Sequence, residues 1–252
     1  MMRSVSGSNS SRGIAAVVGV GPRLGSAVAR KFASGGYTIA ILSRDLGTSQ
    51  KLSQLAEEIA QEAKAQVFAL RVDCADARSV REAFEGVLSL GPVEVLVYNA
   101  GEPTAAADDA AAAARPAPFL SVTPDAFHRS LAVSAAGAFH CAQQVIPGMV
   151  ERGRGTIIFT GSSASLTGFA GYSDLSKLAL LFRLAVAKPH DRNKPVASAA
   201  NRFLELVRAG CGKFALRGLS QSLAREFQPA GVHIAHVIID GVIGERRSVL
   251  RT

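Results

Sequence analysis

The sequence has little of several residue types, and each shortage excludes a class of protein. It contains no tryptophan, and aromatic residues make up only 6% of its 252 residues. Its three cysteines, Cys74, Cys141 and Cys211, lack metal-ligand spacing, and their odd number favours reduced thiols over a disulfide framework. No uninterrupted apolar run reaches the length of a membrane span, so we expect no membrane partner. We therefore expect a cytoplasmic location or another reducing intracellular compartment.

Positive charge is present but unevenly distributed. The net charge is +8, and residues 177–210 carry seven lysines or arginines against Asp191 and Glu205, which makes +5 of it. A basic chain can bind nucleic acid, but here the charge is concentrated in one irregular block, so we expect no nucleic-acid partner. The remaining chain, with 48% hydrophobic residues overall, is long enough for one domain with a substantial core.

A nucleotide-binding pattern opens the chain. The apolar run 15–18 breaks into glycines and continues as a helical pattern with small residues. In a Rossmann unit such glycines let backbone N–H groups approach a pyrophosphate, and the positive end of the helix dipole faces its charge. An ordinary strand-to-helix turn is the alternative when the pattern is taken alone. The candidate cofactor residues in this turn are Gly19, Gly21, Arg23, Leu24 and Gly25.

Three further apolar runs end in residues that suit the same ligand. Run 37–42 is followed by Arg44, where a cation suits a ribose 2′-phosphate and so favours NADP over NAD. Run 67–72 ends at Asp73, placed to accept from the adenine amino group, and run 93–98 leads into an Asn-Ala-Gly sequence. Each feature alone is more often a plain strand end, but the ordered set predicts a dinucleotide site. The candidates here are Arg44, Asp73, Asn99, Ala100 and Gly101.

In these motifs the chain resembles the short-chain dehydrogenase/reductase family, over most of residues 13–241. The resemblance implies an α/β fold with a Rossmann-type doubly wound parallel sheet in a three-layer α/β/α arrangement. It also implies hydride transfer between NADP(H), with NAD as the alternative cofactor, and a small carbonyl or alcohol substrate. A homo-oligomer is left open.

The chain departs from the family pattern at three places. Arg23 stands where the family has its middle glycine, and its guanidinium could pair with a phosphate. The predicted helix 124–149 has Ser134 where the family usually places an asparagine, and Asp240-Gly241 replaces a Pro-Gly pair.

The catalytic register is interrupted after the serine that the resemblance assigns, Ser162. In the family a tyrosine follows this serine by 13 positions and a lysine follows the tyrosine by four, but the chain has Leu175 and Ala179 there. Treating residues 177–210 as an insertion brings Lys213 into register, four places after Leu175. Lys177 is then a coincidental near match and the alternative lysine.

Tyr172 is the tyrosine nearest to these residues. On a helix, Tyr172 and Lys177 lie about 140° apart, whereas an i,i+4 pair lies about 40° apart, so they would not share a face. Tyr172 is a proton donor only if the backbone is irregular, and a packing aromatic otherwise. The catalytic candidates are thus Ser162, Tyr172, Lys213 and Lys177.

The organisation that follows is a disordered tail at 1–12 and a single Rossmann domain at 13–252, with a basic insertion at 177–210. Six strands are readable and the chain stops soon after the sixth, so we expect a sheet incomplete at its carboxyl-terminal edge. An altered transcript of a longer parent would explain the insertion and the short end. Two hypotheses remain: an NADP-dependent oxidoreductase, and a nucleotide-binding pseudoenzyme or non-functional isoform without turnover.

Overall fold

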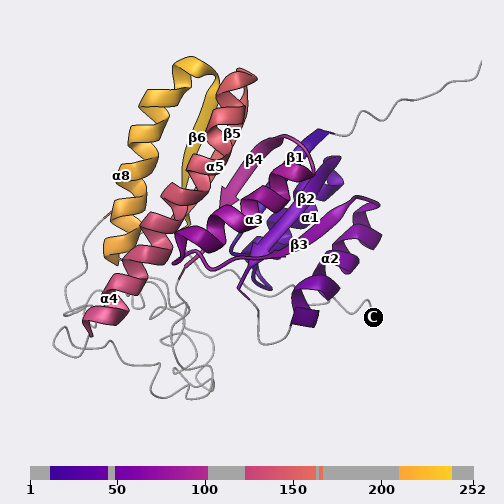
Figure 1. Cartoon of the computed structure of the whole chain (residues 1–252), viewed down its shortest axis with the longest axis horizontal. Helices are drawn as coiled ribbons and strands as arrows, with labels where there is room; N and C mark the ends of the chain where they lie inside the picture. Colours follow the sequence, from indigo (N-terminus) through magenta and orange to yellow (C-terminus); the bar gives the residue numbers. More distant parts are fainter. Residues whose placement is uncertain (1–11, 45–48, 102–122, 163–164, 167–209, 240–252) are drawn as a thin grey trace, which may run out of the picture.

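A single six-stranded parallel sheet organises the molecule. The structure, a computed structural model, describes residues 12–44, 49–101, 123–162, 165–166 and 210–239. The strands lie in the order β3-β2-β1-β4-β5-β6, and every neighbouring pair is parallel (Figure 1). This confirms the predicted doubly wound sheet. The strands are β1 (Arg12–Val18), β2 (Tyr37–Ser43), β3 (Val67–Arg71), β4 (Val93–Tyr98), β5 (Gly155–Ser162) and β6 (Val232–Ile239).

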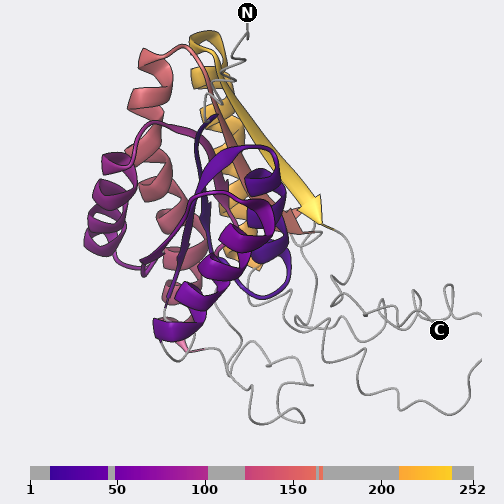
Figure 2. The same cartoon turned by 90° about the vertical axis from the view of Figure 1, so that its right-hand side faces the viewer.

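Helices cover both faces of this sheet, as Figure 2 shows from the side. On one face, Leu96, Phe159 and Leu216 belong to a core shared with α3, α5 and α8; on the other, Ile39 and Ile41 pack with α1 and α2. Strands that are apolar along their whole length, such as β1, need helices on both sides, because a parallel sheet buries both of its faces. The three-layer prediction is therefore confirmed. The helices are α1 (Leu24–Ser34), α2 (Ser49–Ala63), α3 (Ala77–Ser89), α5 (Gly137–Glu151) and α8 (Gly210–Phe227).

The helix predicted at 124–149 is divided into three segments. They are α4 (Pro124–Leu131), a π-helical turn η2 (Ala132–Ala136) and α5. The hydroxyl of Tyr98 in β4 donates to the carbonyl oxygen of Val133 within this turn. A side chain that binds a helical carbonyl competes with the regular ladder, which is a recognised cause of such irregular turns.

Two described elements begin at the edges of segments that the sequence sets apart. β1 begins at Arg12, so this residue belongs to the domain rather than to the predicted tail. Helix α8 begins at Gly210, the last residue of the predicted insertion, and the short 3-10 turn η5 (Gln228–Ala230) separates it from β6. The rest of the insertion, Tyr172, Lys177 and the expected sheet edge beyond Ile239 lie outside the described residues.

The strand order reverses between β1 and β4. The chain adds β2 and β3 on one side of β1, and then adds β4, β5 and β6 on its other side. In open α/β sheets, ligands bind in the crevice beyond the carboxyl ends of the strands at such a switch point. The fold therefore directs attention to the residues that follow β1, β2, β3 and β4. None of the described helices is long and apolar enough to cross a membrane.

Candidate cofactor and active site

The turn after β1 depends on glycine at two positions. Gly19 has φ +82°, and a Cβ there would stand 2.4 Å from the backbone nitrogen of Ala100. A Cβ on Gly25 would stand 2.7 Å from the Cα of Val20, so α1 folds closely back onto the turn. Gly21 has no atom within 4 Å of the corresponding point. The turn thus packs tightly on its protein side and stays open at Gly21.

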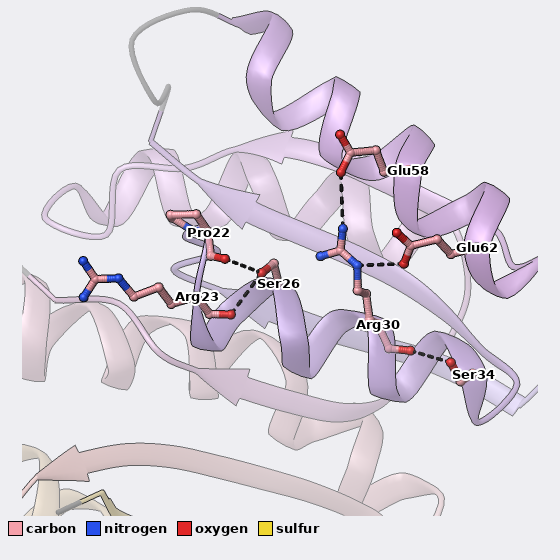
Figure 3. Close-up of polar contacts among 7 residues, drawn as sticks. All are labelled: Pro22, Arg23, Ser26, Arg30, Ser34, Glu58 and Glu62. Atoms are coloured by element: carbon pink, nitrogen blue, oxygen red, sulfur yellow. Dashed lines mark hydrogen bonds and ion pairs between the residues drawn. The ribbon is translucent and has the colours of Figure 1, made fainter. Parts of the chain in front are cut away.

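The first turn of α1 is available to an anion. It has no side-chain cap and no acidic residue. Ser26 donates to the carbonyl oxygens of Pro22 and Arg23 at 3.0 Å, and the exposed Arg23 side chain extends away from the ion pairs of Arg30 (Figure 3). An uncapped helix start with a nearby guanidinium suits a phosphate through both the dipole and the charge.

The strand ends meet around one cleft of about 440 Å³. Gly19 and Gly21 line it, whereas Arg23, Leu24 and Gly25 stand outside its described lining at the start of α1. Among the described residues, no atom lies within 4 Å of where a Cβ on Gly21 or Gly101 would stand, so that part of the chain leaves the backbone there open to a ligand. The described lining residues are Gly19, Val20, Gly21, Ser43, Arg44, Val72, Asp73, Cys74, Asn99, Ala100, Gly101 and Val133.

Asp73 and Asn99 both make bonds within the protein. One carboxylate oxygen of Asp73 accepts from the backbone nitrogen of Ala75 at 3.0 Å, and the other lies 3.8 Å from Arg129. Asn99 donates through Nδ2 to the carbonyl oxygen of Gly19 at 2.9 Å and accepts through Oδ1 from the hydroxyl of Thr160 at 2.9 Å. The Asn99 amide therefore links the end of β4 to the glycine turn and to β5, and Asn99 lines the cleft.

The candidate proton-transfer residues lie at the carboxyl end of β5. Ser162 is the last residue of that strand, is buried, and its hydroxyl has no hydrogen-bond partner among the described residues. Lys213 of α8 donates from Nζ to the carbonyl oxygen of Thr160 at 2.9 Å, two residues before Ser162. Burial lowers the pKa of Lys213 to about 8, because desolvation disfavours its charged form. The fold thus places Lys213 beside the strand end that carries Ser162.

Close packing against η2 sets the position of Lys213. Ser134 in η2 is fully buried and its hydroxyl has no partner among the described residues. A Cβ on Gly212 would stand 2.6 Å from the Cβ of Ser134. The small residues at 134 and 212 therefore let α8 approach η2 closely, immediately before the lysine.

A family model of short chain dehydrogenases matches residues 13–180, which include the glycine turn, all the strand ends around the cleft, and Ser162. The chain belongs to the short-chain dehydrogenase/reductase family. This confirms the resemblance read from its motifs. The match ends before α8, so it does not itself assign Lys213.

Several curated relatives of the chain carry reductase names. A very-long-chain 3-oxoacyl-CoA reductase from Aspergillus clavatus is 30% identical over 157 residues, 60% of this chain and 41% of that protein. An L-xylulose reductase from Bos taurus is 31% identical over 160 residues, 63% of this chain and 57% of that protein. The alignments thus cover only about half the length of these relatives.

The structure of a short-chain dehydrogenase from Rhodopseudomonas palustris has a similar fold. It aligns with a TM-score of 0.67 and 26% identity, over 91% of this chain and 85% of that one.

A histidine near Lys213 had no place in the sequence prediction. His236 of β6 lies over Gly161, where a Cβ would stand 2.5 Å from its Nε2, and that nitrogen is buried without a partner among the described residues. Burial, followed by the charges of Lys213 and Arg217, lowers the pKa of His236. Arg217 also donates to the carbonyl oxygen of Ser165 at 3.2 Å. The only available signal was a histidine inside an apolar strand.

Proposed function

We propose that this chain is an NADP-dependent oxidoreductase that interconverts a carbonyl and an alcohol. The observation that carries the proposal is the convergence of the glycine turn, Arg44, Asp73 and the Asn99–Gly101 segment on one cleft at the strand-order switch. A dinucleotide fits these residues, because Gly21 and Gly101 leave the backbone approachable and α1 offers an uncapped start. The reductase names of the relatives support the same reaction class.

Arg44 would distinguish the two nicotinamide cofactors. Its side chain lines the cleft directly after β2, beside Ser43. A guanidinium at this place binds a ribose 2′-phosphate by charge-assisted hydrogen bonds, whereas two free hydroxyls gain nothing comparable. We therefore propose NADP as the preferred cofactor and NAD as the weaker one.

The residues near β5 would manage the substrate oxygen. When bound, the nicotinamide supplies or accepts the hydride. Ser162 would donate its unpartnered hydroxyl to the substrate oxygen and so orient it. Lys213, whose pKa of about 8 keeps its two protonation states close in energy at neutral pH, would hold a proton and the cofactor ribose near that oxygen. Tyr172 would be the proton donor, with Lys177 as the alternative lysine; both assignments remain predictions.

Cofactor binding and single-turnover hydride transfer on the same preparation test this proposal. The full chain is titrated with NADPH and then mixed with a panel of ketones and aldehydes, beside Ser162→Ala and Lys213→Met. We expect Ser162→Ala to keep NADPH binding and to lose hydride transfer, and Lys213→Met to weaken NADPH binding as well as hydride transfer. A chain that binds NADPH but never transfers hydride would establish the pseudoenzyme alternative, and a chain that binds no NADPH would refute the proposal altogether.

We also propose that the chain is located in a reducing intracellular compartment such as the cytoplasm. We propose further that it forms a homo-oligomer. A groove of about 530 Å³ between α5 and α8 includes the exposed side chains of Phe139 and Val150 beside Leu223 and Phe227. Such a patch can meet its own copy across a twofold axis. Light scattering should show a dimer or larger species that Phe139→Glu dissociates; a monomer at all concentrations would contradict this.

A further inference from the structure

Two of the three cysteines lie together beneath the cofactor cleft. Cys74 follows Asp73 after β3 and lines the cleft, whereas Cys141 of α5 is fully buried in the adjoining core. Gly137 packs directly on Cys74, since a Cβ on Gly137 would stand 2.9 Å from the Cβ of Cys74 and 2.5 Å from its carbonyl oxygen. Cys141 lies one helical turn after Gly137 and so shares the face that meets Cys74.

The two cysteines belong to the same buried core, and their thiols differ in character. The hydrogen bond from the Cys141 thiol, the largest influence, lowers the pKa of Cys74, whereas burial raises the pKa of Cys141. The nearby hydroxyl of Tyr98 donates to the carbonyl oxygen of Val133 and stays protonated, because burial raises the pKa of Tyr98. The cysteine that meets the cleft is therefore the more easily ionised one, and its neighbour is a neutral thiol behind it.

We propose that Cys74 and Cys141 form a reactive dithiol that closes to a disulfide when hydrogen peroxide enters the cleft. The Cys74 thiolate attacks one peroxide oxygen, the O–O bond breaks, and hydroxide leaves and takes up a proton to become water. The sulfenic acid formed on Cys74 is then attacked by the sulfur of Cys141. The S–S bond forms, the S–O bond breaks, and the oxygen leaves with the Cys141 proton as a second water. Two thiols are oxidised by two electrons and one peroxide is reduced to two waters.

The disulfide would alter the adenosine end of the cleft. Cys74 lies between Asp73 and Ala75 in the sequence. The backbone nitrogen of Ala75 donates a hydrogen bond of 3.0 Å to the carboxylate of Asp73. Linking Cys74 to α5 constrains this turn, so NADPH binding should weaken by about tenfold, the scale of one impaired hydrogen bond. This consequence rests on the proposed function, whereas disulfide formation does not.

Because the chain has only three cysteines, mass spectrometry can identify the product completely. The full chain carrying Cys211→Ser is reduced, exposed to hydrogen peroxide, alkylated and digested. We expect an intact-mass loss of about 2 Da, reversed by dithiothreitol, and a peptide pair joining Cys74 to Cys141. The matched variant Cys141→Ser, in the same background, should instead accumulate oxygen on Cys74. If both thiols are still alkylated after peroxide treatment, or if Cys74 joins Cys211 in the parent, the dithiol does not exist.

An NADPH arm separates this inference from the proposed function. NADPH bound in the cleft should slow the oxidation of Cys74, and oxidised protein should bind NADPH about tenfold more weakly. A disulfide that forms equally fast with and without NADPH, in a chain that binds none, would refute the cofactor assignment and leave the dithiol standing. Absence of the disulfide in a chain that binds NADPH normally would refute the dithiol alone.

Discussion

The two halves of the sheet build their parts of the site in different ways. In the half formed by β1 to β4, the cofactor candidates directly follow strands, and the backbone itself supplies the glycine turn and the uncapped start of α1. In the half formed by β5, α8 and β6, Ser162 and Lys213 are 51 positions apart in the sequence, and Lys213 reaches the end of β5 at Thr160 because α8 packs on η2. In Figure 1 these halves lie side by side, with α8 over the β5–β6 edge.

This difference separates cofactor binding from proton transfer. The sheet fixes the strand ends, so the backbone of the paired strands positions the residues of the proposed cofactor cleft. The proposed proton-transfer residues depend on how one helix docks, and the family register between Ser162 and Lys213 is interrupted in the sequence. We therefore expect the first half to tolerate changes that disable the second.

The largest effect should come from placing a phenol in the family register with Lys213. Deleting residues 177–210 joins Ser176 to Cys211 and places position 175 four residues before Lys213. In that deletion variant, Leu175→Tyr should raise turnover with NADPH by about 10² to 10⁴, the usual contribution of a general acid. The same substitution in the full chain is the control and should do little. Equal gains in both backgrounds would show that the insertion does not displace the register.

Substituting Gly19 tests the packing of the glycine turn in the first half of the sheet. Gly19 and Gly36 have nearly the same left-handed backbone, φ +82° and +84°, but only Gly19 meets backbone atoms where a Cβ would stand. Both alanine substitutions should cost about 1–2 kcal/mol of folding free energy from strain. Gly19→Ala should cost about 1–3 kcal/mol more, because the overpacked turn must move against Ala100. Chemical denaturation measures the difference, and equal losses would show that the close contact at Gly19 carries no free energy.

A matching pair of glycines tests the catalytic half. A Cβ on Gly212 would meet Ser134 at 2.6 Å, whereas Gly218 of the same helix has open space. Gly218→Ala should stabilise the protein by about 0.5–1 kcal/mol, because alanine favours a helix. Gly212→Ala should destabilise it by about 1–3 kcal/mol and reduce hydride transfer, since α8 must move and carry Lys213 with it. A stabilising Gly212→Ala would contradict the proposed docking of α8 on η2.

The sequence predicted the cofactor half more completely than the catalytic half for a physical reason. Alternating apolar runs and glycine breaks encode strand ends locally, so the cleft residues could be named together. The π-helical turn at 132–136 could not be anticipated, because it reflects the hydroxyl of Tyr98 on Val133, a contact between distant segments. His236 escaped notice for the same reason: only packing over Gly161 brings it beside Lys213.

A pH-dependent effect follows from the desolvated lysine of α8. The pKa of Lys213 is about 8 in the folded protein and about 10.4 for an exposed lysine, so the unfolded chain binds more protons between these values. Relative to Lys213→Met, the parent should therefore gain stability as pH rises from about 8 to about 10, with no change below 8. Lys31→Met, at an exposed lysine of α1, is the control. Parallel curves for parent and Lys213→Met would show that Lys213 is not desolvated.

The most direct test of the account is whether the first half binds the expected cofactor. NADPH and NADH are titrated in separate experiments into the parent and into Arg44→Asp. The account predicts that the parent prefers NADPH by about 10- to 100-fold, from a charge-assisted hydrogen bond of about 1.5–3 kcal/mol, and that Arg44→Asp erases or reverses this preference. Superimposable NADPH and NADH curves in the parent would contradict it.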